Sequence, residues 1–143
     1  MTLSVTEADF DAETAAHLAR TVDGPIVAWF APFSPAVDAV RFLQAFHVLA
    51  TWGRPDAYVV MAGPVDDTAH YAALQQYATE LNLDRAWLAA DPSPGRLESF
   101  RQAAALVFMP GVFAAADRAA GRRLGAGELG LAIAELLPPP GAP

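Results

Sequence analysis

Short apolar runs alternate with longer amphipathic segments along most of the chain. Continuous apolar runs occur at 25–30 (PIVAWF), 57–62 (AYVVMA), 86–90 (AWLAA) and 105–109 (ALVFM). An unbroken apolar run is typical of a parallel strand that is covered on both faces. The run VFAAAD at 112–117 is a further candidate strand, so the pattern predicts a sheet of four to five strands.

Segments with helical periodicity separate these runs. At 8–21, 36–51, 68–82, 95–104 and 127–137 the apolar residues recur at the spacing of one helix face. Regular alternation of strand and helix predicts a three-layer α/β/α domain with a mainly parallel sheet. A Rossmann-like fold is the first interpretation, and a thioredoxin-like fold is the alternative.

Length and composition indicate one folded domain. The chain has 143 residues, of which 54% are hydrophobic and 17% charged, as in globular rather than disordered proteins. We expect a single α/β domain over 1–137 and a proline-rich tail over 138–143. No apolar run reaches the roughly 18–20 residues that cross a membrane, and the acidic start, MTLSVTEADFDAET, does not resemble a secretory signal. We therefore expect a cytoplasmic protein without a membrane span.

The charged residues exclude several kinds of chemistry. A net charge of −7 argues against a nucleic-acid partner, because phosphate backbones are bound mainly by clustered cations. All nine basic residues are arginines, and the chain has no lysine and no cysteine, which excludes Schiff-base, P-loop-lysine, disulfide and dithiol chemistry. His17, His47 and His70 lie on separate predicted helices, and none has a second ligand three or four residues after it, so we expect no metal site and no cofactor.

Several segments together carry a family resemblance. They are DGPIVAWFAPFSPAVDAVRFLQAFHVLA, RPDAYVVMAGPVDD, HYAALQQYATELNL and GRLESFRQAAALVFMPG. In this order, over roughly residues 22 to 111, they resemble the C-terminal, nucleotide-sugar-binding half of GT-B glycosyltransferases of the family 4 type. The resemblance implies a Rossmann-like domain that holds a sugar nucleotide.

Open parallel sheets bind ligands outside the carboxyl ends of their strands. The expected crevice is therefore built from 31–35, 63–67, 91–93 and 110–112, with backbone N–H groups as its polar atoms. Within it, the candidate binding residues are Ala31, Pro32, Phe33, Ser34, Gly63, Asp66, Pro110 and Gly111. We assign no catalytic residue.

The resemblance also shows what this chain lacks. The Arg and Lys that pair with the donor phosphates in the family fall on Pro32 and Val37 here. Each charge-assisted hydrogen bond is worth about 1.5–3 kcal/mol. The expected function is therefore a degenerate glycosyltransferase-like domain without autonomous catalysis, which binds a nucleotide or nucleotide sugar weakly or serves as an interaction module.

Two acidic pairs have both a functional and a structural interpretation. Glu128 and Glu135 could match the paired glutamates of the family, but exposure on one face of the last helix is the ordinary interpretation. Asp66 and Asp67 could contact a cation or a ribose, and more often such a pair caps the next helix, here beginning near Thr68.

The remaining candidate side chains have the same double interpretation. Ser34 is better explained as the start of a helix than as a nucleophile, and Asp91 and Ser93 as turn residues. Trp29 and Phe33 are core aromatic residues or platforms on which a base stacks.

A second family resembles the same residues. VTEADFDAETAAHLARTVDGPIVAWFAPFSP is similar to the start of a thioredoxin-like domain, whose redox loop begins aromatic-Ala-Pro-aromatic. Ser34 and Val37 stand at its cysteine positions and Ala104 at its cis-proline, which implies a redox-inactive accessory protein that binds a protein partner. A homo-oligomer and an excised or engineered fragment are further possibilities. A fully parallel sheet favours the glycosyltransferase-like interpretation, and an antiparallel hairpin after residue 105 favours the thioredoxin-like one.

Overall fold

The computed structural model describes residue 18 and residues 24–35, 37–83 and 85–138. The helix predicted at 8–21, which carries His17, lies outside the described residues except for Leu18, and so does most of the proline-rich tail.

The strands of the described residues form one parallel sheet. They are β1 (Ile26–Phe30), β2 (Tyr58–Gly63), β3 (Ala86–Ala90) and β4 (Leu106–Phe108). Their order across the sheet is β3-β2-β1-β4, and Trp29 of β1 lies level with Met61 of β2 and Phe108 of β4. The chain moves outward from β1 to β3 and then returns to the other side of β1. This topology confirms the predicted mainly parallel, Rossmann-like α/β fold.

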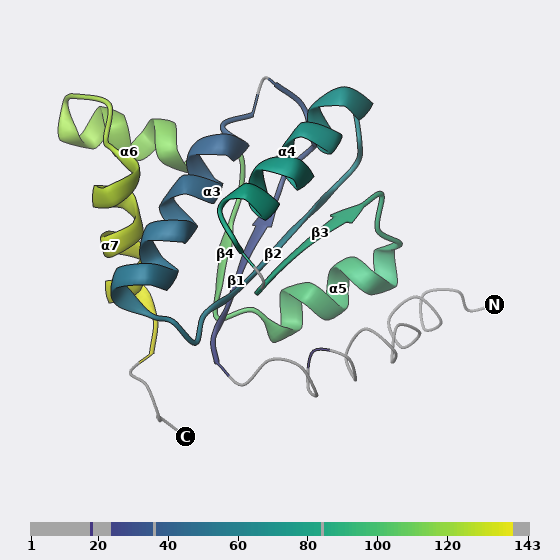
Figure 1. Ribbon diagram of the computed structural model, residues 1–143, viewed down its shortest axis with the longest axis horizontal. Coiled ribbons are helices and arrows are strands. Elements are labelled where there is room, and N and C mark those ends of the chain that lie inside the picture. The colour runs from purple at the N-terminus through teal and green to yellow at the C-terminus, as the bar shows by residue number, and fades with distance from the viewer. Residues whose placement is uncertain (1–17, 19–23, 36, 84, 139–143) are drawn as a thin grey trace.

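Helices cover both faces of the sheet (Figure 1). The helices are α3 (Ala39–Val48), α4 (Thr68–Glu80), α5 (Pro94–Ala103), α6 (Val112–Ala120) and α7 (Ala126–Leu136), and a π-helical turn, η1 (Leu49–Gly53), follows α3. Buried residues of α3, α4, α6 and α7 share one core with the sheet, whereas Phe100 of α5 and Leu18 belong to the core on the other face. α7 packs along α3, on the side of the sheet that ends in β4 (Figure 1).

The central strands are buried because alternate side chains enter opposite cores. Val27 and Trp29 of β1 pack on the α3 side, while Ile26 packs on the α5 side. All six residues of β2 are buried. Continuous apolar runs at these positions are the consequence of covering both faces of a parallel sheet.

Two sequence-based assignments after the strands are wrong. The run VFAAAD, predicted as a strand, begins helix α6, because Gly111 at a φ of 93° ends the extended chain and the alanines that follow favour a helix. Helix α3 begins at Ala39 with Asp38 as its N-cap, whereas Ser34 lies before the helix, where its carbonyl accepts a turn hydrogen bond from the Val37 N–H at 3.0 Å.

The chain after residue 105 follows the parallel arrangement. β4 pairs with β1 in parallel and α6 comes directly after it, so no antiparallel hairpin is present there within the described residues.

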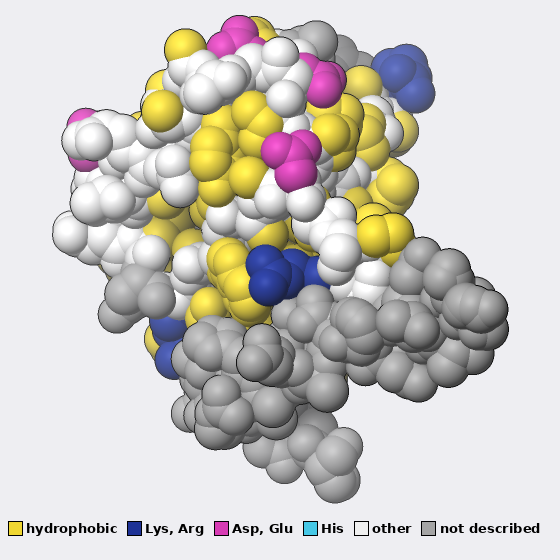
Figure 2. Space-filling model, turned by 90° about the vertical axis from the view of Figure 1, so that its right-hand side faces the viewer, with side chains coloured by type: hydrophobic (Ala, Val, Ile, Leu, Met, Phe, Trp, Pro, Cys, Tyr) yellow, Lys and Arg dark blue, Asp and Glu magenta, His cyan; other side chains and the backbone are white. Residues whose placement is uncertain are grey.

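The surface shows no concentration of cations on the face drawn in Figure 2. Arginine side chains stand apart from one another there, among apolar and neutral groups. Of the helices in the described part of the chain, none has the length and apolar character that crossing a membrane requires.

Candidate functional site

The predicted crevice between β1 and β2 is closed by the chain's own backbone. The Phe33 N–H donates to the Pro64 carbonyl at 2.8 Å, and the N–H groups of Asp66 and Asp67 both donate to the Phe33 carbonyl at 3.2 Å. These donors were expected to face a ligand phosphate. They are instead used in joining the two loops.

Gly63 allows this closure because the loops approach each other closely. A Cβ at Gly63 would lie 2.0 Å from the Ala31 carbonyl oxygen. Next to it, the Asp91 N–H donates to the Gly63 carbonyl at 2.9 Å, and the Asp91 carboxylate accepts from the Val65 N–H at 3.0 Å. The carboxyl ends of β1, β2 and β3 are thus held together by internal hydrogen bonds.

The predicted site residues in these loops have structural positions. Phe33 is buried and meets Tyr71 edge-on, with ring centroids 4.7 Å apart, so it is a core residue. Asp67 caps α4 by accepting from the His70 N–H at 2.9 Å, as the capping interpretation predicts. Asp66 is exposed. Pro32 and Ser34 are half-buried, and Ala31 and Gly63 are buried beside them.

Capping also accounts for two other candidates. Ser93 accepts a hydrogen bond from the Arg96 N–H at 3.1 Å and caps α5. Glu128 accepts from the Gly125 N–H at 3.1 Å at the start of α7 and pairs with Arg122. Glu128 therefore has local partners, and Glu135, farther along α7, is exposed.

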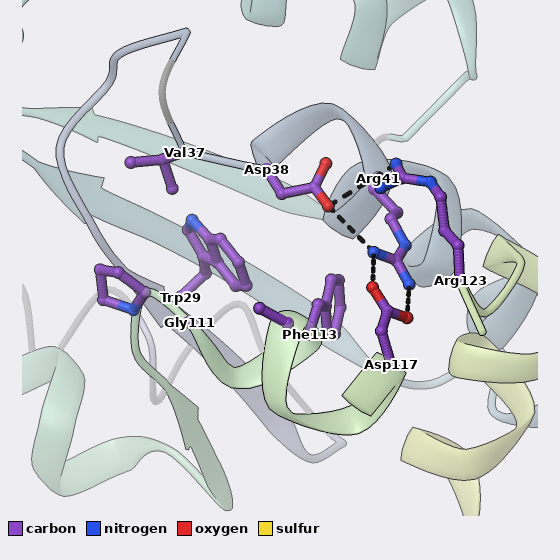
Figure 3. A pocket seen from close by; sticks show the side chains of 10 residues that line it. Trp29, Val37, Asp38, Arg41, Gly111, Phe113, Asp117 and Arg123 are labelled. Atoms are coloured by element: carbon purple, nitrogen blue, oxygen red, sulfur yellow. Dashed lines mark hydrogen bonds and ion pairs between the residues drawn. The ribbon is translucent and has the colours of Figure 1, made fainter. Parts of the chain in front are cut away.

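A cavity of about 230 Å³ opens at the carboxyl ends of β1 and β4. Trp29 of β1, Arg41 of α3, and Pro110 and Gly111 after β4 contribute to its lining (Figure 3). We call it the Trp29 pocket. Of the predicted site residues, Pro110 and Gly111 line it, and the others belong to the closed loops.

The pocket lies at the point where the strand order changes direction. β1 leads through α3 to β2 on one side, and β4 leads into α6 on the other side of β1. Helices α3 and α6 both begin at the pocket. Asp38, the N-cap of α3, makes no side-chain capping hydrogen bond, and Gly111, the N-cap of α6, has no side chain that could make one. Uncapped first-turn N–H groups give such helix ends an affinity for anions and other acceptors.

Trp29 supplies a hydrogen-bond donor to this pocket. The residue is 2% exposed, and its ring stacks on Phe42 at 4.5 Å, with Phe113 at 5.5 Å. Among the residues that the structure describes, its indole N–H has no hydrogen-bond partner. Figure 3 shows the indole nitrogen on the side of the ring that faces Val37. Because Phe42 covers one ring face, the N–H is the group that Trp29 most directly offers to a ligand.

Arg41 is the centre of the charged side of the pocket. Its side chain is 5% exposed and forms a bidentate pair with Asp117, at 2.9 Å from Nη1 and 2.5 Å from Nη2. Nη1 also donates to Asp38 at 3.1 Å, and the guanidinium carbon lies 5.3 Å from the centre of the Phe113 ring. At the mouth, Nη2 of Arg123 lies 3.7 Å from Asp38.

The pair with Arg41 determines the protonation state of Asp117. The hydrogen bonds from Arg41, followed by the one from the Leu124 N–H, lower the pKa of Asp117 to about 2. Asp117 is therefore a carboxylate at neutral pH and accepts from Arg41. The Nε of Arg41 is buried and has no hydrogen-bond partner in the described part of the chain.

Sequence reasoning missed Arg41, Asp38 and Asp117. Arg41 and Asp117 are 76 residues apart, and Asp117 fell in a run that was assigned to a strand. The one local signal was the spacing of Asp38 and Arg41, since residues three apart on a helix are neighbours. Their location beside Trp29 depends on the strand order.

The described residues contain no group of three or more His, Cys, Asp or Glu side chains arranged to hold a metal ion. His47 and His70 lie on α3 and α4, and His17 is outside the described residues. No protein-family model and no curated protein sequence matches the chain.

Proposed function

We propose that this domain binds the nucleoside part of a nucleotide or nucleotide sugar weakly in the Trp29 pocket and does not transfer the sugar on its own. The observation that carries the proposal is the position of the pocket. It opens between β1 and β4, at the switch in strand order where open α/β sheets bind their ligands. The glycosyltransferase-like resemblance supplies the ligand class.

The chemistry of the lining supports this class of ligand. The Trp29 N–H can donate to a carbonyl or hydroxyl oxygen of the nucleoside, and Arg123, whose side chain is 70% exposed, stands at the mouth where a phosphate would leave the pocket. The start of α6 adds backbone N–H groups beside Gly111.

The size of the pocket supports weak binding. Ligand sites usually measure about 300–1,000 Å³, whereas this cavity measures about 230 Å³. It therefore encloses one part of a nucleotide sugar and leaves the remainder outside. The pKa of Asp117 is lowered to about 2 by its pair with Arg41, which makes Asp117 a poor proton donor or acceptor for sugar transfer.

Thermal unfolding in the presence of ligands tests the proposal. The panel comprises UDP, GDP, ADP and their sugar conjugates at about 5 mM. A ligand at about 100 times its dissociation constant stabilises a protein by about 2.7 kcal/mol. We expect the unfolding temperature to rise with one nucleotide series, and Trp29→Phe, which keeps an aromatic ring and removes the N–H, to lose most of that rise.

Trp52→Phe is the matched control, because Trp52 is 79% exposed on η1 and does not line the pocket. It should keep the full effect of the ligand. An unchanged unfolding temperature across the whole panel would contradict nucleotide binding and favour the alternative, an interaction module for a protein partner. An equal rise in wild type and Trp29→Phe would place the ligand elsewhere.

A further inference from the structure

The charged side chains that line the Trp29 pocket cancel one another. They are two cations, Arg41 and Arg123, and two carboxylates, Asp38 and Asp117. The pocket thus has no surplus positive charge to receive a diphosphate, and the chain as a whole carries a net charge of −7. A ligand with several negative charges is therefore opposed both locally and over a longer range.

The two carboxylates differ in how firmly they are held. Asp117 accepts hydrogen bonds from both terminal nitrogens of Arg41, at 2.9 and 2.5 Å, and a further one from the Leu124 N–H. Asp38 shares a single oxygen, Oδ2, between Arg41 at 3.1 Å and Arg123 at 3.7 Å. Asp38 therefore contacts both arginines, and because Asp117 also pairs with Arg41, the charge of Asp38 extends to Arg123 at the mouth of the pocket (Figure 3).

Asp38 occupies the place where a ligand phosphate would meet Arg123. Its side chain is 39% exposed, and that of Arg123 is 70% exposed, so both are accessible at the mouth. A phosphate oxygen that approached Arg123 would come close to the Asp38 carboxylate. Like charges a few ångströms apart repel strongly where the protein partly excludes water.

We infer that Asp38 sets the charge of the ligand, so that the pocket prefers a nucleoside or another uncharged polar ligand to a nucleoside diphosphate. This inference rests on the proposed function and specifies the ligand class of that site. Asp38 acts by repelling further negative charge. Its pairing with Arg123 weakens the attraction of that cation for a phosphate.

Titration of matched ligands into wild type and two variants tests the inference. Uridine, UMP and UDP, followed by the adenine series, are titrated into wild type, Asp38→Asn and Asp66→Asn by calorimetry at low salt. Asparagine preserves the size and the N-cap preference of residue 38. Arg41 retains its ion pair with Asp117 in this variant. Asp66→Asn removes the same charge from an exposed residue at the same edge of the sheet, away from the pocket.

We expect wild type to bind the diphosphate no more tightly than the nucleoside. Asp38→Asn should bind the diphosphate about tenfold more tightly and leave the nucleoside affinity within about twofold. Asp66→Asn should behave like wild type. The gain in Asp38→Asn should shrink as the salt concentration rises, because exposed charges are then screened.

A second variant makes the test independent of any effect of Asp38 on folding. Arg123→Gln alters an exposed side chain and should weaken UMP binding several-fold without changing uridine binding. If wild type binds uridine and Asp38→Asn binds UDP no better than Asp66→Asn does, the inference is wrong and the proposed function stands. If neither wild type nor Asp38→Asn binds any of these compounds, the proposed function fails and the inference fails with it.

Discussion

Gly63 shows how one residue determines whether a loop can hold a ligand. Its missing side chain lets the Ala31 carbonyl approach to 2.0 Å from the position of a Cβ, and the loops after β1 and β2 then close on each other. In a sequence, a glycine at the end of a strand suggests space for a phosphate. In this fold the backbone of the neighbouring loop fills that space.

Replacing this glycine should therefore destabilise the domain strongly. We expect Gly63→Ala to lower the free energy of unfolding by about 3 kcal/mol, because the clash is with a carbonyl rather than with a flexible side chain. Gly127→Ala in α7, where a Cβ would meet no atom within 4 Å, should raise it by about 0.5–1 kcal/mol. Urea unfolding measures both, and a loss below about 0.5 kcal/mol in Gly63→Ala would contradict the close approach.

The charged residues of the site illustrate what a sequence leaves undetermined. Asp38 and Arg41 are near each other on any helix drawn through 36–51, but their relation to Asp117 exists only after β4 has paired with β1. Phe33 and Pro32 were candidates because of their neighbours in the chain, and neither lines the Trp29 pocket. Local spacing predicts caps well, as at Asp67, and predicts long-range ion pairs poorly.

At the scale of elements, α6 is attached by few groups. Phe113 is its buried residue, and the Arg41–Asp117 pair joins it to α3. Glycines with positive φ flank the helix: Gly111, with a φ of 93°, precedes its first residue, and Gly121, with a φ of 75°, follows its last residue. Elements with few buried contacts open more readily than the core.

Asp117→Asn should accordingly loosen α6 selectively. We expect the amide hydrogens of 113–120 to exchange faster in this variant, while those of α3 keep their protection, because the Arg41–Asp117 ion pair joins the two helices. Glu135→Gln, an exposed change on α7, is the control. Amide exchange followed by NMR measures this, and an equal acceleration in all helices would point to general destabilisation instead.

The elements themselves were largely predictable from the sequence. The apolar runs at 25–30, 57–62, 86–90 and 105–109 correspond to β1 to β4, and no end differs by more than one residue. Burial on both faces of the sheet requires such runs. The run at 112–117 failed because a short apolar segment does not distinguish a strand from a buried helix face. The alanines of this run favour a helix, and the turn at Gly111 ends the extended chain before it.

At the scale of the molecule, arginine–carboxylate pairs contribute to the response to acid. Hydrogen bonds from Arg101, Arg41 and Arg122 lower the pKa values of Glu98, Asp117 and Glu128 to about 2. Because the folded-state pKa values lie below the ordinary values of 4.5 for Glu and 3.8 for Asp, the pairs stabilise the fold above about pH 4.5. That contribution is lost as the pH falls to about 2.

We therefore expect the unfolding temperature to fall progressively between about pH 4.5 and pH 2, and to vary little from these groups between pH 5 and 7. Arg122→Gln removes the partner of Glu128 and should reduce the decline, since one depressed pKa returns toward its usual range. Calorimetry at several pH values measures the slope. The same unfolding temperature at pH 5 and pH 2 would contradict this account.

Across the whole molecule, the strand order β3-β2-β1-β4 places a pocket at Trp29, for which we propose a nucleoside ligand. The most direct measurement is a ¹H–¹⁵N spectrum of the tryptophan indole groups during titration with uridine and UDP, with signals assigned from Trp29→Phe and Trp52→Phe. We expect the Trp29 indole signal to move in a saturable way while that of Trp52 stays fixed. A Trp29 signal that remains unmoved at millimolar ligand would contradict it.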